Sequence, residues 1–145
     1  MTDTTVFPLH VLLVEDDDDH ADLTRIALEA HNPKHRVERV ADGAAALDYL
    51  FQRGPYVEVD RPDLVLLDLN LPRANGLDVL AAVKEDPERR VIPVVVLTTS
   101  DAETDRARAY GSYANSYVVK PVNFDKFQAM IYELGDYWAC WNQLP

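Results

Sequence analysis

The feature that most restricts the fold of this chain is an alternation, repeated five times, of short apolar runs with segments of helical period. The runs that predict strands are Leu9–Val14, Arg36–Val40, Leu64–Leu67, Ile92–Leu97 and Ser116–Val119. Segments of helical period lie near residues 18–30, 43–52, 76–86 and 102–110, and a last one begins near residue 124. Regular alternation of this kind is typical of an α/β domain built on a parallel sheet.

The composition of the runs predicts the order of the strands. Val11–Val14, Leu64–Leu67 and Val94–Leu97 are apolar at every position, as strands are when helices cover both faces of a sheet. Arg36–Val40 and Ser116–Val119 carry polar residues, which suits the two edges. The pattern therefore predicts a flavodoxin-like, doubly wound, five-stranded parallel sheet of order 2-1-3-4-5 with right-handed crossovers.

Capping residues indicate where the helices begin. Asp42 and Asn123 are expected to cap the second and the last helix. Ser100–Glu103 has the form of a capping box, which predicts a helix that starts directly after the fourth strand. Val122 and Phe127 are spaced to form a hydrophobic staple across the start of the last helix.

Length and charge limit the classes of function. The 145 residues are expected to form one domain over residues 1–145, with a core from about 9 to 133 and a C-terminal extension from about 134 to 145. The net charge of −11 argues against binding to nucleic acid or to an anionic membrane. The start Met1–Thr5 lacks the features of a signal peptide, no apolar run could span a bilayer, and a single cysteine, Cys140, excludes an internal disulfide. We therefore expect a cytoplasmic protein.

Acidic residues follow two of the central strands. Glu15 and Asp16 come after the first strand and Asp68 after the third, at the point where the strand order switches and ligands bind in such sheets. Carboxylates that meet without a cation would repel one another, and a hard divalent cation such as Mg²⁺ removes that conflict. Thr98 and Lys120 end the fourth and fifth strands and bring a hydroxyl and an ammonium to the same edge.

This group of side chains suits phosphoryl transfer. A carboxylate can attack a phosphoryl group when the charge on the transferring oxygens is neutralised. Asp68 lies nearest the middle and is the expected nucleophile, Mg²⁺ and Lys120 would each pair with a phosphoryl oxygen, and Thr98 would donate a hydrogen bond to a third. Taken singly, each of these residues has a plain explanation, as a helix cap, a solvated strand end or a β-branched strand residue. It is their agreement at four strand ends that favours a site.

The same residues carry a resemblance to a known family. Val14-Glu15-Asp16, Asp68-Leu69-Asn70-Leu71-Pro72, Thr98-Thr99 and Lys120-Pro121 closely resemble the signature of bacterial response-regulator receiver domains, in the right order over nearly the whole chain. The resemblance implies a phosphorelay response regulator that takes a phosphoryl group from a sensor histidine kinase onto Asp68. Because no DNA-binding module is expected after the last helix, its output would be a change in protein contacts, or it would pass the phosphoryl group onward. It would not be a free-standing enzyme.

The resemblance also implies roles for individual residues. Asp16 and Asp68 would bind Mg²⁺ directly, Glu15 through water, and Asn70 through its backbone carbonyl. Thr98 and Tyr117 match the family's switch pair, in which the hydroxyl moves toward the phosphoryl group and the aromatic ring turns inward. The peptide bond before Pro121 is cis in this family. The four histidines, at positions 10, 20, 31 and 35, show no ligand spacing and are assigned no role.

Within that family, the chain is similar to the small single-domain regulators paired with bacterial phytochrome kinases. The grounds are the long loop at residues 53–62, the segment Leu97–Ser100 and the aromatic C-terminal tail. Trp138 and Trp141 continue the helical stripe of the last helix beyond the length that the sheet needs. We expect them to be exposed and to form a partner surface, most simply that of a homodimer, although Gly135 would weaken such a helix.

Other classes of function remain open from the residues alone. Haloacid-dehalogenase-type phosphatases also use an aspartate nucleophile and magnesium, but they carry a second aspartate two residues later, where this chain has Asn70. A receiver that acts only as a scaffold is disfavoured because every expected group is present. A flavin-binding protein of the same fold would need a phosphate-cradling loop after the first strand, and here that loop is acidic.

Overall fold

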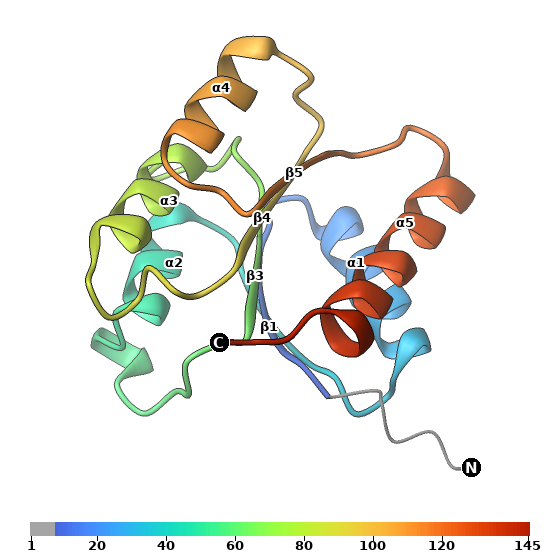
Figure 1. The fold of residues 1–145 in the computed structure, drawn as a ribbon, viewed down its shortest axis with the longest axis horizontal. Helices are drawn as coiled ribbons and strands as arrows, with labels where there is room; N and C mark the ends of the chain where they lie inside the picture. Colours follow the sequence, from blue (N-terminus) through green and yellow to red (C-terminus); the bar gives the residue numbers. More distant parts are fainter. Residues whose placement is uncertain (1–7) are drawn as a thin grey trace.

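The structure, a computed structural model, describes residues 8–145, so the start Met1–Thr5 lies outside the described residues. Its centre is a parallel sheet in which five strands follow the order β2-β1-β3-β4-β5 (Figure 1). The strands are β1 (His10–Val14), β2 (Arg36–Val40), β3 (Leu64–Leu67), β4 (Val94–Thr98) and β5 (Ser116–Val119). The predicted fold class, strand order and edge positions are thus confirmed.

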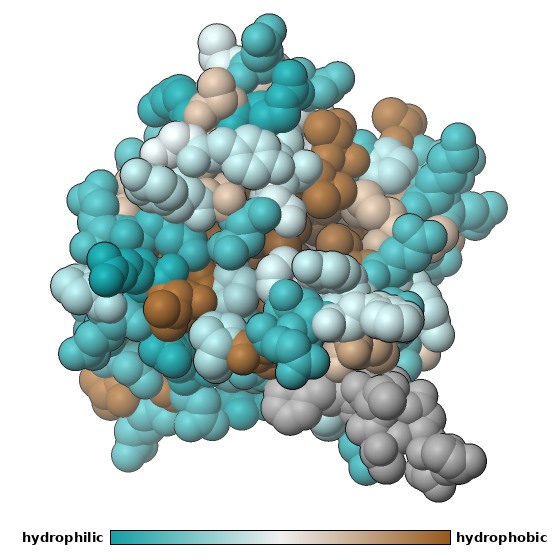
Figure 2. All heavy atoms as spheres, viewed as in Figure 1, coloured by the Kyte–Doolittle hydropathy of each residue, from teal (hydrophilic) through white to brown (hydrophobic). Residues whose placement is uncertain are grey.

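Helices cover both faces of the sheet. On one face lie α1 (Asp18–His31) and α5 (Phe124–Asp136), and on the other lie α2 (Gly43–Leu50), α3 (Gly76–Glu85) and α4 (Glu103–Gly111) (Figure 1). The strands β1, β3 and β4 are buried at every position, as expected for the apolar runs that make up most of each strand. Hydrophilic residues cover most of the surface seen in Figure 2. Within residues 8–145, no helix has both the length and the apolar character needed to cross a membrane.

Two of the predicted helix starts are confirmed and two local predictions are wrong. Asp42 accepts a hydrogen bond from Ala45 N and Asn123 one from Lys126 N, as capping residues do. The capping box at residues 100–103 does not form: α4 begins at Glu103, because the Ser100 hydroxyl donates to Asp105 over 2.5 Å instead. The hydrophobic staple is also absent, since the Val122 side chain is fully exposed to solvent.

In the C-terminal tail, one of the two tryptophans that were expected to be exposed is buried. After α5 the chain continues as the π-helical turn η2 (Tyr137–Trp141). Trp138 is only 6% exposed and belongs to the core beneath α1 and α5, so it cannot be part of a partner surface. Trp141 is 75% exposed, as predicted. Gly135 is buried against α1, where a side chain would meet His31.

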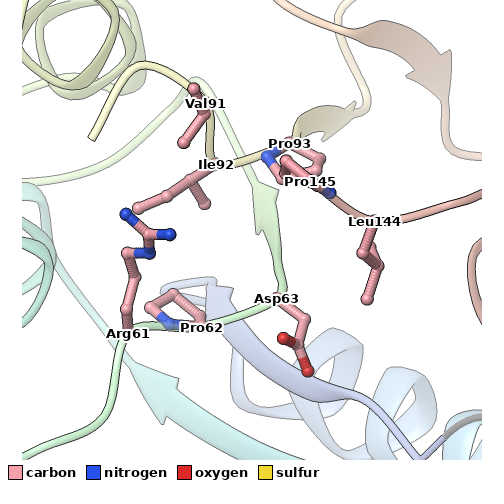
Figure 3. Close-up of a pocket in the computed structure, with 8 residues that line it drawn as sticks. All are labelled: Arg61, Pro62, Asp63, Val91, Ile92, Pro93, Leu144 and Pro145. Carbon is pink, nitrogen blue, oxygen red and sulfur yellow. The ribbon is translucent and has the colours of Figure 1, made fainter. Parts of the chain in front are cut away.

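The last residues cross to the amino ends of the strands, opposite the edge where the acidic residues gather. The loop before β3 includes the 3₁₀ turn η1 (Gly54–Tyr56), and its end at Arg61 helps to line a cavity of about 210 Å³. Leu144 and Pro145 lie across that cavity from Arg61, next to Pro93 (Figure 3). The tail therefore packs at the end of the sheet that lies opposite the acidic site.

Candidate active site

The carboxyl ends of β1 and β3 bring three acidic residues together, as predicted. Asp68 N donates to Val14 O over 3.0 Å, which aligns the end of β3 with the end of β1. Carboxylate oxygens of Glu15, Asp16 and Asp68 all lie within 4.8 Å of one another. Glu15 and Asp68 are buried, whereas Asp16 is exposed, so the group opens to solvent on one side.

Lys120 joins two of these carboxylates. Its backbone N–H donates to Thr98 O over 2.7 Å, which continues the pairing of β5 with β4 and points the residue at the acidic group. The Nζ atom lies 2.5 Å from Glu15 Oε1 and 3.0 Å from Asp68 Oδ2, and its side chain is almost completely buried. No peptide bond within residues 8–145 is cis, so the bond before Pro121 is trans, the conformation of lower energy, and not cis as the resemblance implies.

Burial has a marked effect on Glu15. It raises the pKa of the Glu15 carboxyl to about 7, because the charged form loses water, while the hydrogen bond and charge of Lys120 oppose this rise. The negative charge of Asp68 adds to it. A carboxylate in this position gains from any further cation, which is the condition for a metal site made of oxygen ligands.

Thr98 and Tyr117, which the resemblance predicts to be a switch pair, both bond to the backbone of Ser100. Thr98 is fully buried at the end of β4, and its Oγ1 accepts a hydrogen bond of 3.3 Å from Ser100 N. Tyr117 is half-buried on β5, and its hydroxyl donates to Ser100 O over 2.9 Å. Asn70 N donates to Asp68 Oδ1 over 3.1 Å, which places the Asn70 backbone beside the proposed nucleophile.

Two residues at the site were missed by sequence reasoning. The Nδ1 atom of His20, on the first turn of α1, lies 2.9 Å from Lys120 Nζ. Arg39, at the end of β2, donates from Nε to Glu15 O over 2.8 Å and from Nη1 to Asp18 Oδ1 over 2.9 Å, so it holds the acidic loop. The available signal was topological: the start of α1 and the end of β2 both lie at the same edge of the sheet as the acids.

A second cluster of metal-binding residue types lies where α1 and α5 end. Ligand atoms of His31, Asp136 and Cys140 lie within 4.8 Å of one another. Leu9 N donates to His35 Nδ1 over 2.9 Å, so a neutral His35 carries its hydrogen on Nε2 and donates it to His31 Nδ1 over 3.0 Å. A neutral His31 then keeps its hydrogen on Nε2, the atom that faces Asp136 and would have to bind a metal. This chain of hydrogen bonds favours a structural role.

The comparisons with known proteins identify the family. The model of the response regulator receiver domain matches residues 11–132, most of the chain. The chain belongs to this family. It is 43% identical over 139 residues to the probable methanogenesis regulatory protein FilR2 of Methanothrix harundinacea, and the match covers 95% of this chain and 88% of FilR2. It is 38% identical over 145 residues to the response regulator Rcp1 of Synechocystis sp., and this match covers 100% of the chain and 99% of Rcp1.

Solved structures of receiver domains agree with the fold. The phosphorylated cyanobacterial phytochrome response regulator RcpA superposes with a TM-score of 0.93 at 39% identity, covering 95% of this chain and 99% of that one. The Mn²⁺-bound form of Rcp1 gives a TM-score of 0.91 at 38% identity, with the same two coverages of 95% and 99%. This receiver domain is therefore a response regulator of two-component phosphorelay signalling, similar to phytochrome response regulators.

Proposed function

We propose that Asp68 accepts a phosphoryl group from the phosphohistidine of a sensor histidine kinase, with Mg²⁺ bound beside it. The observation that carries the proposal is the contact of 3.0 Å between the buried Asp68 carboxylate and the buried Lys120 ammonium, at an edge that opens to solvent at Asp16. A nucleophilic carboxylate next to a buried cation is what phosphoryl transfer requires.

The acidic group fits a divalent cation, because its donors are oxygens and one of them is exposed to water. We assign Asp16, Asp68 and the backbone carbonyl of Asn70 to direct contact with Mg²⁺, and Glu15 to contact through water. The ion would supply positive charge that stabilises the phosphoryl oxygens in the transition state. The Mn²⁺-bound form of Rcp1, a protein 38% identical to this chain, supports a divalent cation here.

The protein groups have separate tasks in the transfer. An Asp68 oxygen attacks phosphorus while the bond from phosphorus to the histidine nitrogen breaks, so the product is an acyl phosphate. Lys120 pairs with one phosphoryl oxygen, because Asp68 gives up its own charge as the bond forms. The Thr98 hydroxyl accepts from Ser100 N and still has its hydrogen to donate to the phosphoryl group. Its movement would release Ser100 and let Tyr117 turn inward.

The signal would be transient and the chain would not act on outside substrates. Water hydrolyses an acyl phosphate, which returns Asp68 to its carboxylate. A phosphatase with repeated turnover needs a general acid near the leaving group, and Asn70, whose amide cannot serve as one, occupies the position of that acid. Phosphotransfer and autodephosphorylation would therefore be reactions of the regulator on itself.

The partner and the assembly are part of the proposal. RcpA, which is 39% identical, is a phytochrome response regulator, and this supports a bacterial phytochrome as the sensor kinase. Trp141, three-quarters exposed at the end of the helical tail, supports a homodimer formed through residues 134–145. The single receiver domain over residues 1–145 would then change its protein contacts when Asp68 is phosphorylated.

The test is the intact mass of the protein after incubation with acetyl phosphate and Mg²⁺. The proposal expects a gain of one phosphoryl group that requires Mg²⁺ and is lost in Asp68→Asn. Asp19→Asn is the matched control, since Asp19 is an exposed acid on the first turn of α1 and takes no part in the proposed site. A gain that persists in Asp68→Asn, or no gain in the wild type under any condition, overturns the proposal.

A further inference from the structure

His20 is held beside the active-site lysine by contacts of its own. It is the third residue of α1, and its backbone N–H donates to the helix cap Asp17 over 3.0 Å. Its carbonyl accepts from Thr24 Oγ1 over 2.8 Å, and its ring centroid lies 5.9 Å from that of Phe127 on α5. The helices α1 and α5 lie side by side (Figure 1). His20 is therefore anchored in place without help from Lys120.

The direction of the bond between His20 and Lys120 follows from the chemistry of the ammonium. A lysine ammonium has three hydrogens to donate and no lone pair to accept. Its three partners here are Glu15 Oε1, Asp68 Oδ2 and His20 Nδ1, at 2.5, 3.0 and 2.9 Å. The His20 Nδ1 must therefore accept, and the neutral ring carries its hydrogen on Nε2. All three donors of this buried charge are used.

The three acceptors differ in what phosphorylation does to them. Asp68 becomes an acyl phosphate, and Glu15 belongs to the proposed metal site. His20 is the neutral acceptor, and in the proposed reaction it binds neither the metal nor the phosphoryl group. We infer that His20 is a positioning residue, which holds the Lys120 ammonium at the place where the phosphoryl group on Asp68 will need it. This inference rests on the proposed function of Asp68.

Removal of the acceptor has a defined consequence. One N–H of a buried ammonium would lack a partner, and the four-carbon side chain would be free to move toward the Glu15 carboxylate, its closest partner. Lys120 would then meet the phosphoryl group out of alignment, and misplacement of a reacting group by about 1 Å can cost a factor of about 100 in rate. The competing explanation is that His20 is simply a flat ring that packs on Phe127.

Two substitutions separate these explanations. His20→Asn keeps an acceptor, because Asn Oδ1 is as many bonds from the backbone as His Nδ1, but it loses the ring. His20→Phe keeps a ring to pack on Phe127 and loses the acceptor. His20→Leu is a second acceptor-free variant, for use if the Phe variant does not fold. Each protein is tested for its thermal unfolding and for its rate of phosphorylation by acetyl phosphate at saturating Mg²⁺, followed by intact mass.

A positioning role predicts that His20→Asn stays within about twofold of the wild-type rate and that His20→Phe or His20→Leu loses about tenfold, the size of one misaligned hydrogen bond to a charged group. The inference is overturned if the acceptor-free variants keep the wild-type rate, or if His20→Asn falls as far as they do. Wild-type protein that takes up no phosphoryl group would overturn the proposed function itself, which is a different outcome from any difference among the His20 variants.

Discussion

The Tyr117 hydroxyl donates a hydrogen bond to the backbone carbonyl of Ser100 over 2.9 Å, which ties the edge strand β5 to the loop that follows β4. The backbone N–H of Ser100 in turn donates to the Thr98 hydroxyl over 3.3 Å. The two residues of the proposed switch are thus linked through Ser100 before any phosphoryl group arrives. A movement of Thr98 toward Asp68 would have to break one of these bonds and loosen the other.

Tyr117→Phe tests the strength of this link in the unphosphorylated protein. The ring stays and only the hydroxyl is lost, so the free energy of unfolding is expected to fall by about 1 kcal/mol, the usual net value of one hydrogen bond. Tyr113→Phe is the control, because the Tyr113 side chain is 75% exposed and its hydroxyl can bond to water. Equal urea midpoints for the two variants would contradict a stabilising role for the bond to Ser100.

Mg²⁺ is expected to stabilise the folded protein through Asp16 and Asp68. A ligand that binds only the folded state adds RT ln(1 + [L]/Kd), which is about 1.4 kcal/mol at ten times the dissociation constant. Thermal unfolding with increasing Mg²⁺ should therefore show a rising midpoint in the wild type and little change in Asp16→Asn or Asp68→Asn. Asp19→Asn should respond like the wild type. A loss of response in Asp19→Asn as well would point to general screening of the acidic surface.

Acidification is expected to destabilise the protein through His35. Burial, and to a smaller extent the charge of His31, lowers the pKa of His35 from 6.5 to about 4 in the folded state. Between these two values the unfolded chain binds more protons, so stability is complete above about pH 6.5 and is lost as the pH falls toward 4. The loss is at most about 3 kcal/mol.

His35→Asn is the variant that isolates this effect. The Asn side chain can still accept the hydrogen bond from Leu9 N, which lies 2.9 Å from His35 Nδ1, but it does not titrate. Urea unfolding of both proteins at several pH values between 4 and 7 should give a smaller slope of stability against pH for the variant. Parallel slopes would show that His35 does not account for the acid sensitivity.

The sequence predicted well those features that depend on the order of the strands and on the residues at their carboxyl ends. Unbroken apolar runs place β1, β3 and β4 at the centre, and topology then brings Asp68 and Lys120 to one edge although they lie far apart along the chain. Features that depend on the path of a single turn were predicted less well: the caps Asp42 and Asn123 were found, and the start of α4 was not. Ser100 had the spacing of a helix cap, but its hydroxyl bonds to Asp105, and α4 starts three residues later.

The same distinction explains His20 and Trp138. His20 has no recognisable ligand spacing, and its proposed role follows only once the start of α1 and the residue after β5 are seen to meet at the acidic end of the sheet. Trp138 follows the period of an α-helix when the sequence is examined, so it was grouped with Trp141. In the structure Trp138 lies three residues after the buried Gly135 and seven after the buried Ile131, so it continues the face of α5 that packs on the sheet, and the tail packs on the core for one more turn than expected.

Gly135 and Gly111 provide a test of helix packing. Alanine is normally more stable than glycine in a helix by about 1 kcal/mol. A Cβ on Gly135 would lie 3.2 Å from His31 Cγ, and His31 is held by its stacking and hydrogen bond to His35, so Gly135→Ala is expected to lower the stability. Gly111→Ala places its Cβ in open space and is expected to raise it. Chemical denaturation of both variants checks the opposite signs. A gain in stability in both would mean that His31 on α1 moves aside to make room for the added Cβ.

The tail holds one buried and one exposed tryptophan, so their replacement should have very different effects on stability. Trp138→Ala leaves a cavity in the core on the side of the sheet that α1 and α5 cover, and is expected to cost about 3–5 kcal/mol of unfolding free energy. Trp141 is 75% exposed, so Trp141→Ala should change stability by less than about 0.5 kcal/mol. If residues 134–145 form the proposed homodimer, Trp141→Ala should instead shift the protein toward monomer in sedimentation equilibrium. Unchanged association in that variant would remove the tail from the dimer interface.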